Sequence, residues 1–221
     1  MHIFKKPLFL CISGLVACQS LFAQATGAEE IVIKATGTFK KISDNIAPSK
    51  AIMDALKSSS QSERDKAVKE IEAHPGNYIP PVFFLLSQVL FNEDKKDMAA
   101  FWFYFGQLRG RYDANRCADI SARSGMGVLN QNFGPQINKY AFANLSFLEA
   151  LIPKVMELDA AVPHNYDQRW INLHGMGAVL GEDEEGRISL PEKLWPQILA
   201  DTRKDYLRGF NEAMAEMKKL K

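Results

Sequence analysis

The sequence predicts a mainly α-helical protein, a helical bundle with one helical hairpin and one short N-terminal strand. Three observations predict this class. Apolar residues recur at intervals of three and four through most of residues 46–221, which is the period of an amphipathic helix. Prolines and Ser-x-x-Glu motifs stand where several of these segments begin, as they do at helix N-termini. Strand-like sequence is confined to residues 31–39, and a lone strand is poorly stable.

Residues 1–25 have the organisation of a signal peptide. Lys5 and Lys6 precede residues 7–18, an uncharged apolar stretch that is shorter than the roughly 20 residues needed to span a bilayer. Residues 23–25, Ala-Gln-Ala, then supply the small-x-small pattern of a signal peptidase site. The alternative is a buried N-terminal helix, which seldom runs from paired lysines into such a site. We therefore expect a periplasmic or secreted protein that is cleaved after residue 25.

A second cleavage site overlaps the first. Residues 15–18, Leu-Val-Ala-Cys, resemble a bacterial lipobox, in which the chain is cut before the cysteine and the cysteine is acylated. Cys18 is therefore a candidate lipid anchor, and simple secretion is the alternative. After cleavage the chain keeps one cysteine, Cys117, which cannot close an internal disulfide. We expect Cys117 to be a small buried residue, since no group that would activate a thiol is evident beside it.

The balance of charge restricts the class of partner. Two of the 27 lysines and arginines and none of the 26 acidic residues lie in the signal, which leaves a net charge of −1 on the rest of the chain. A near-neutral protein is poorly suited to binding nucleic acid, because that affinity comes from neutralising phosphates. No later stretch is apolar for long enough to cross a membrane. Another protein is the expected partner, and no motif indicates a cofactor or a metal.

The first half of the mature chain divides into a lead-in and a series of helices. Residues 26–45 are expected to form a polar lead-in, and residues 46–221 a single helical domain. Residues 60–63, Ser-Gln-Ser-Glu, predict a capping box that opens a helix. The prolines at 80–81 suit the first turn of the next helix, where a proline lacks only a donor that is unpaired there anyway. Another helix is expected to begin near Asp97.

Prolines also divide the second half of the chain. Gly134-Pro135 is expected to restart the chain after a loop, and Pro153 to kink or break the following helix. Residues 161–167 are expected to form a structured loop and residues 181–187 a solvated acidic loop. Residues 189–192, Ser-Leu-Pro-Glu, predict a second capping box that opens the last helix.

Residues 80–111 resemble one tetratricopeptide or Sel1-type helical hairpin. In those repeats large and small residues alternate, so that two antiparallel helices pack closely. The matching positions here are Phe83, Leu86, Ser87 and Leu90 in the first helix and Ala99, Phe103 and Gly106 in the second. Arg111 stands where the repeats usually have proline, and no second copy follows. Because an isolated repeat buries too little surface to be stable, we expect a bundle that contains one hairpin.

A wider stretch, residues 79–177, resembles a group of uncharacterised exported proteobacterial proteins. The resembling segments are residues 101–109 (FWFYFGQLR) and 165–171 (NYDQRWI). No established activity goes with that group, so the resemblance implies no catalytic residue. The aromatic residues at 102–105 would face all round their helix, which favours a buried core helix over an aromatic binding surface.

The first candidate site group consists of Arg109, Tyr112, Asp113 and Arg116. If the helix continues through Gly110, these residues share one face, because they stand at i, i+3, i+4 and i+7. Each arginine is then at ion-pair spacing from Asp113. The guanidinium groups could hold a carboxylate or a phosphate, since their forked donors match oxyanions. Alternatively, the group is a structural ion-pair network.

The second candidate group is a loop that carries His164, Tyr166, Asp167, Arg169 and Trp170. His164 and Asp167 could form a general-base pair if they fold together. A zinc site is not indicated, because the sequence has no His-Glu-x-x-His motif. Alternatively the loop is structural, and Asp167 caps a helix that begins at the next residue.

Both groups combine arginine with aromatic residues, a mixture that is common at interface hot spots. We predict that the two groups meet in space and share one polar, partner-binding surface. Two functions remain open. The first is a non-catalytic protein-interaction protein, such as one that neutralises an effector. The second is an envelope hydrolase that uses the loop around His164 and Asp167 together with the arginines. It should place His164 or His174 in a cleft, with a carboxylate in hydrogen-bond reach.

Overall fold

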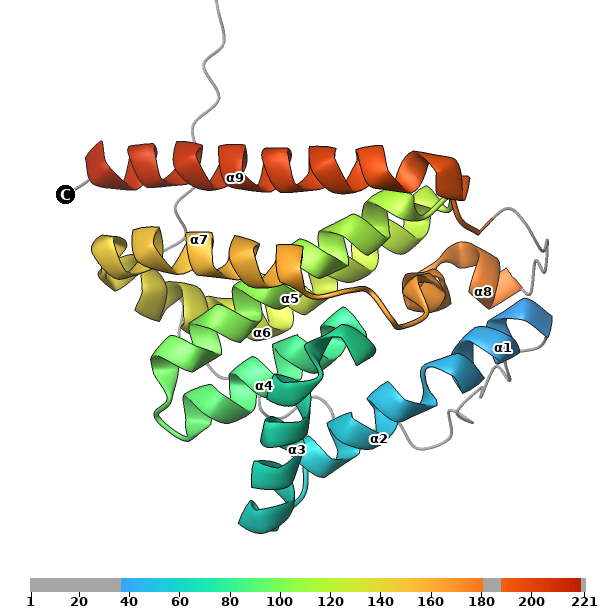
Figure 1. The fold of residues 1–221 in the computed structure, drawn as a ribbon, viewed down its shortest axis with the longest axis horizontal. Coiled ribbons are helices and arrows are strands. Elements are labelled where there is room, and N and C mark those ends of the chain that lie inside the picture. The colour runs from blue at the N-terminus through green and yellow to red at the C-terminus, as the bar shows by residue number, and fades with distance from the viewer. Residues whose placement is uncertain (1–36, 181–187, 220–221) are drawn as a thin grey trace, which may run out of the picture. The chain divides into compact units, whose positions relative to one another are not determined.

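The computed structural model describes residues 37–180 and 188–219 (Figure 1). The predicted signal peptide at residues 1–25, the lipidation site Cys18 and the acidic loop at residues 181–187 lie outside the described residues. So does the first part of the predicted strand. Within the described ranges, no helix combines the length and the apolar character that crossing a membrane requires.

The described residues form a mainly α-helical bundle, as predicted, joined by short 3-10 turns. The α-helices are α1 (Gly37–Asn45), α2 (Ala47–Leu56), α3 (Gln61–Ala73), α4 (Pro80–Asn92), α5 (Lys96–Arg116), α6 (Ser124–Ala143), α7 (Leu145–Ala161), α8 (Met176–Leu180) and α9 (Trp195–Lys219). The 3-10 turns are η1 (Pro75–Asn77), η2 (Ile120–Arg123), η3 (Gln168–His174) and η4 (Glu192–Leu194). Extended pairing in this part of the chain is limited to one isolated bridge between Cys117 and Ser189.

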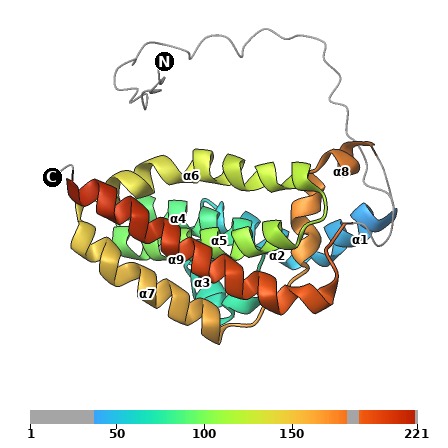
Figure 2. The same ribbon diagram turned by 90° about the horizontal axis from the view of Figure 1, so that it is seen from above.

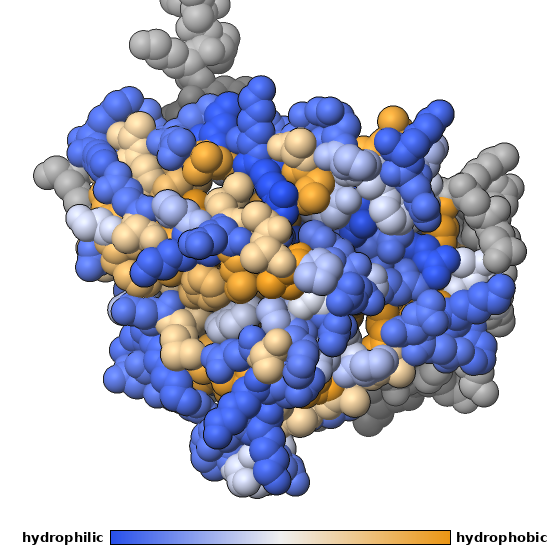
Figure 3. All heavy atoms as spheres, in the orientation of Figure 1, coloured by the Kyte–Doolittle hydropathy of each residue, from blue (hydrophilic) through white to orange (hydrophobic). Residues whose placement is uncertain are grey.

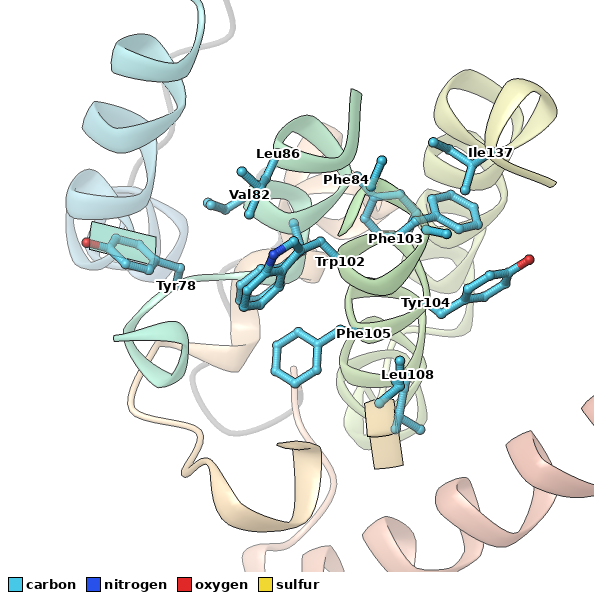
Figure 4. Packing of buried hydrophobic residues seen from close by; sticks show 14 of the residues in the cluster. Tyr78, Val82, Phe84, Leu86, Trp102, Phe103, Tyr104, Phe105, Leu108 and Ile137 are labelled. Atoms are coloured by element: carbon cyan, nitrogen blue, oxygen red, sulfur yellow. The ribbon is translucent and has the colours of Figure 1, made fainter. Parts of the chain in front are cut away.

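Helix α5 forms the centre of the bundle, and α4, α6, α7 and α9 pack against it (Figures 1 and 2). Its first half buries aromatic side chains on every side, as the sequence predicts, and Phe103 and Phe105 have no exposed surface. Figure 4 shows Phe103 between Phe84 of α4 and Ile137 of α6. The rings of Phe84 and Phe103 meet edge to face with their centroids 5.3 Å apart, a favoured aromatic geometry.

Helices α4 and α5 form the predicted hairpin, joined by a tight turn at residues 93–95. Asp94 takes the turn with a positive φ of 62°. The helices approach closely at Gly106, where an added Cβ would lie 3.0 Å from the Cβ of Phe83. A small residue is therefore required there, as in the repeat pattern. Membership of a repeat family stays a prediction, because close packing at a glycine is not specific to those repeats.

The predicted lead-in and strand are wrong for the residues that the structure describes. Residues 37–45 form helix α1 and do not extend as a strand. Phe39, Ile42 and Ile46 are buried, with Ile42 fully so, and α1 packs against η3. Spacings of three and four between these residues make a helical stripe, and burying that stripe outweighs the strand preference of residues 36–39.

The predicted restart at Gly134-Pro135 is wrong, because α6 runs through both residues; α7 continues past Pro153, so that proline does not break its helix. A proline inside a helix frees the carbonyl four residues earlier, which here belongs to Gln131 and Glu149. Both of those residues are exposed, so water can bind the freed carbonyl groups. Gly134 itself packs closely on the ring of Phe103, 3.2 Å from where its Cβ would lie. The packing of the two helices thus continues across both prolines.

Both predicted capping boxes differ from the structure. Ser60 is at the N-cap position of α3, but its side chain makes no capping bond, and Glu63 accepts a hydrogen bond from Ser58 instead. Ser189 begins no helix, because it lies in the extended bridge opposite Cys117. The last helix begins only at Trp195, after the 3-10 turn at Glu192–Leu194.

Candidate functional site

The two candidate groups meet in space, as predicted. Arg109, Tyr112, Asp113 and Arg116 lie along the second half of α5, and the segment from residue 162 through η3 returns to them from the end of α7. The rings of Tyr112 and His164 have centroids 5.1 Å apart. The indole Nε1 of Trp170 donates to Asp113 Oδ2 over 2.7 Å. The contact is a buried one, however, rather than the exposed surface that the sequence predicted.

Asp113 is the anchor of this buried network. Its side chain is 1% exposed and accepts hydrogen bonds from Arg116, Trp170 Nε1 and the Tyr166 hydroxyl, the last over 3.0 Å. Burial raises the pKa of Asp113, and these three donors act against that rise. Burial likewise raises the pKa of Tyr166, so its hydroxyl keeps the proton that it donates. One carboxylate thus fixes both the turn η3 and the preceding loop to α5.

Arg116 extends the network to helix α9. Its guanidinium carbon lies 3.9 Å from the ring centroid of Tyr112 and 4.7 Å from that of Trp195. Stacking between two aromatic rings suits the flat guanidinium, and Asp113 binds its end. The Nε atom of Arg116 is buried without a hydrogen-bond partner in the described structure, which reduces the net stabilisation that the residue provides.

Arg109 does not pair with Asp113, which corrects one ion pair that the spacing predicted. Because the oxygens of Asp113 are already bound, the fully buried Arg109 turns to Asp159 of α7, 3.5 Å away. It also donates to the carbonyl oxygens of Val162 and Pro163, over 3.2 and 2.7 Å. Arg109 therefore holds the loop after α7 by its backbone.

Asp159 and Arg203, which were not among the predicted site residues, belong to the same network. Arg203 of α9 donates to Asp159 Oδ2 over 2.7 Å and to the Asp159 carbonyl over 2.9 Å. Asp159 is 1% exposed and follows Val155 by one helical turn on the buried face of α7. The sequence signal that could have identified Asp159 is its position in the apolar stripe of α7. A buried carboxylate needs a charged or hydrogen-bonding partner.

His164 is surrounded by positive charge. Burial, with the charges of Arg109, Arg116 and Arg203, lowers the pKa of His164 to about 3, so its imidazole is neutral near pH 7. Its Nε2 lies 3.9 Å from Asp159 Oδ1 and has no hydrogen-bond partner in the described structure. An imidazole with so low a pKa is a poor proton acceptor.

Asp167 forms a separate unit with Arg169 and Asn45. Its carboxylate accepts the backbone N–H of Arg169, which caps η3 as predicted, and it also binds the Arg169 guanidinium. Asn45 Nδ2 of α1 donates to its other oxygen over 2.8 Å. Burial alone would raise the pKa of Asp167, but the bonds from Arg169 and Asn45 outweigh it and hold that pKa below its usual value.

A cleft of about 1090 Å³ lies beside the network. Its walls come from α1 and α2, from residues 77–78, from the loop at residues 165–169 and from residues 188–195. Tyr166, Asp167 and Arg169 line it, whereas Arg109, Arg116 and Trp170 are buried behind the wall. This volume is slightly above the usual range of small-molecule pockets, which is about 300–1,000 Å³. On the face drawn in Figure 3, apolar residues form small areas separated by hydrophilic ones.

Residues 188–190 form one wall of the cleft as an extended segment. Ala118 N donates to the Ile188 carbonyl over 3.1 Å, and Leu190 N donates to the Arg116 carbonyl over 2.7 Å. Asn172 adds a hydrogen bond to the Ile188 carbonyl. Cys117, opposite Ser189, is buried as predicted, and burial raises the pKa of its thiol. Among the described residues, no group of three or more His, Cys, Asp or Glu could hold a metal ion.

Comparison with known proteins finds similarity to a protein without an assigned activity. The chain is similar to an uncharacterised protein of Haemophilus influenzae, 26% identical over 206 residues, which cover 91% of this chain and 79% of the relative. No protein-family model matches the chain, and no solved structure matches it. The class defined here is therefore a structural one: a helical bundle with a buried arginine–aspartate network behind a cleft.

Proposed function

We propose that the protein is an exported, non-catalytic binding protein that holds part of another protein in the cleft. The observation that carries this proposal is that, among the described residues, the polar groups behind the cleft wall are mostly paired, whereas several of those that line the cleft are not. Most of the groups behind the wall are bound to one another, which fixes the wall. Groups at the cleft remain open: the Gln168 amide has no hydrogen-bond partner in the described structure, and Glu192 has no ion-pair partner there. A rigid wall with open polar groups favours binding, because little freedom is lost on association.

The hydrolase alternative is weakened by the placement of its two candidate residues. His164 has a pKa near 3 and is not among the residues that line the cleft. Asp167 does line the cleft, but its oxygens are bound by Arg169 and Asn45. The two residues thus belong to different clusters, and neither is placed to accept a proton from a ligand in the cleft.

The proposed location of the protein in the envelope rests on the signal-like residues 1–25. Neutralisation of an effector is one task that a non-catalytic binding protein performs there. The proposal requires that a protein partner contact the cleft in cells that export the full chain. A binder that used another face, such as the exposed side of α7, would leave the cleft without contacts.

Photocrosslinking in cells tests this requirement. The full-length chain would carry benzoylphenylalanine in place of Gln168 in the cleft or, as the matched control, in place of exposed Glu157 on α7. After irradiation we expect a discrete, protease-sensitive adduct from position 168 and none from position 157. Equal adducts from both positions, or none from position 168, would contradict the proposal.

A further inference from the structure

On the basis of the proposed function, we propose that the cleft takes an extended segment of the partner protein. The segment would add as a strand to the free edge of residues 188–190 and present a basic side chain to Glu192. Three independent features of the cleft, each judged among the described residues, lead to this occupant: an unpaired backbone edge, half-used amide side chains and an uncompensated negative charge.

The backbone edge is at Ser189. Cys117 and Ser189 face each other between the two hydrogen bonds that Ile188 and Leu190 make, so they form a non-hydrogen-bonded antiparallel pair. In such a pair the N–H and the C=O of each residue point away from the partner strand. In the described structure neither group of Ser189 has a hydrogen-bond partner, and Ser189 lines the cleft. An unpaired N–H and C=O on one residue form a template for an added strand.

The amide side chains that line the cleft have donors or acceptors left over. Asn45 uses only its Nδ2, toward Asp167, and Asn77 uses only its Oδ1, as acceptor for Asn165. The Oδ1 of Asn45, the Nδ2 of Asn77 and the whole Gln168 amide have no partner in the described part of the chain. Uncharged groups that donate and accept match the peptide groups of an extended chain.

The charges of the side chains that line the cleft determine which peptide sequences it would bind. The charged side chains that line the cleft are those of Asp167, Arg169 and Glu192. Asp167 and Arg169 compensate each other at 2.7 Å, whereas Glu192 is exposed and has no ion-pair partner among the described residues. A lysine or arginine near Glu192 would complete the balance, and a glutamate there would be repelled. Tyr78 and Trp195 add aromatic surface for neighbouring side chains.

Two substitutions at Ser189 test the strand edge. Ser189→Pro removes the outward N–H while leaving both bonds of the bridge, which use the backbone of Ile188 and Leu190. Ser189→Ala, the matched control, removes the hydroxyl and keeps the N–H. The probe is a pool of fluorescein-labelled heptapeptides with lysine fixed at the centre and the other positions randomised, read by fluorescence anisotropy. We expect Ser189→Pro to weaken binding about tenfold, since a carbonyl of the peptide loses its donor, and Ser189→Ala to change it less than about twofold.

A second pool, with glutamate at the centre, tests the charge. The wild-type protein should bind the lysine pool about tenfold more tightly, and Glu192→Lys should reverse the order, whereas Glu157→Lys should leave it unchanged. The charge test stands even if Ser189→Pro fails to fold, as judged from its melting curve. Equal affinity of the wild-type protein for both pools, or equal effects of the two Ser189 variants, would overturn the inference.

The remaining outcomes separate this inference from the proposed function. If neither pool binds but the adduct at position 168 persists, the cleft contacts a folded surface, so the strand inference falls and the binding function stands. If the adduct is absent too, both fall. Self-association in sedimentation experiments that Ser189→Pro abolishes would identify a second copy as the occupant and overturn the choice of a partner protein.

Discussion

In α5, the first half of the helix carries Trp102, Phe103 and Phe105, whereas the second half carries Arg109, Asp113 and Arg116. All six side chains are at most 5% exposed. The aromatic half is buried favourably by any apolar neighbours of the right size and shape. The polar half needs named partners in fixed directions, because a buried charge without them is costly. The comparison suggests that the aromatic half supplies the stability of the bundle and the polar half fixes where the loop and α9 lie.

The difference has a consequence for the cleft. Two parts of its wall, residues 165–169 and 188–195, contact the polar half of α5: Tyr166 donates to Asp113, and the guanidinium of Arg116 lies on the ring of Trp195. Substitutions in the aromatic half should destabilise the whole protein. Substitutions in the polar half should first change the structure of the cleft. The following predictions test this contrast, from the largest expected effect to the smallest.

Phe103→Ala should give the largest loss of stability. The ring is fully buried between α4 and α6, and its removal leaves a cavity, so we expect a loss of about 3–5 kcal/mol in the free energy of unfolding. Urea denaturation followed by circular dichroism measures it. Met98→Ala, which truncates an exposed residue of the same helix, is the control and should cost less than about 1 kcal/mol. An unchanged midpoint for Phe103→Ala would contradict the hairpin packing.

Arg116→Ala should cost nearly as much, about 3–4 kcal/mol, because it leaves the buried Asp113 without its counter-ion. The double variant Arg116→Ala/Asp113→Ala should cost clearly less than the sum of the single variants, since the two residues are in direct contact. Denaturation of all three proteins gives the coupling energy. Additivity within about 0.5 kcal/mol would show that the two charges act independently.

His164 should make the polar half sensitive to acid. Its pKa is lowered to about 3 in the folded protein, against about 6.5 when unfolded, so the unfolded chain binds the extra proton between those values. Its contribution to stability is therefore present above about pH 6.5 and is lost as the pH falls toward 3. Between pH 7 and pH 5 the wild-type protein should lose about 2 kcal/mol more than His164→Gln. Equal losses in the two proteins would show that His164 is protonated in the folded state.

The sequence could predict the aromatic half of α5 and the meeting of the two groups, for different reasons. Continuous burial of residues 102–105 follows from aromatics on every face of one helix. The contact of His164 and Trp170 with α5 was predicted from composition alone. The burial of this contact was not predicted, because an exposed surface was expected. Spacing predicted the Arg116–Asp113 pair, since both lie on α5, but also a wrong Arg109–Asp113 pair, because Asp159 lies 50 residues away along the chain. Partners on other helices have no local signature.

The cleft could not be predicted, because its wall includes extended residues that were expected to begin a helix. Ser189 fits a capping box by sequence, yet the bonds of its neighbours to Arg116 and Ala118 outweigh that local preference. The restart at Pro135 was wrongly predicted for a related reason, and Pro153 likewise leaves its helix unbroken. Each stands on an exposed side of its helix, where the freed carbonyl can reach water, and exposure of a helix face depends on the packing of the whole bundle.

The smallest predicted effect is that of Arg203→Gln, and it separates the edge of the network from its centre. Arg203 is 27% exposed and shares Asp159 with Arg109, so water and the remaining arginine can compensate part of its loss. We expect a cost of about 1 kcal/mol, well below that of Arg116→Ala, because partly exposed ion pairs contribute little. Arg208→Gln, on the same helix but 62% exposed with Asp205 and Glu212 as partners, is the matched control and should change the unfolding midpoint negligibly. Added salt should reduce the Arg203 effect only slightly, since Asp159 is 1% exposed and poorly screened. If Arg203→Gln instead cost as much as Arg116→Ala, Asp159 rather than Asp113 would be the anchor that fixes the wall of the cleft.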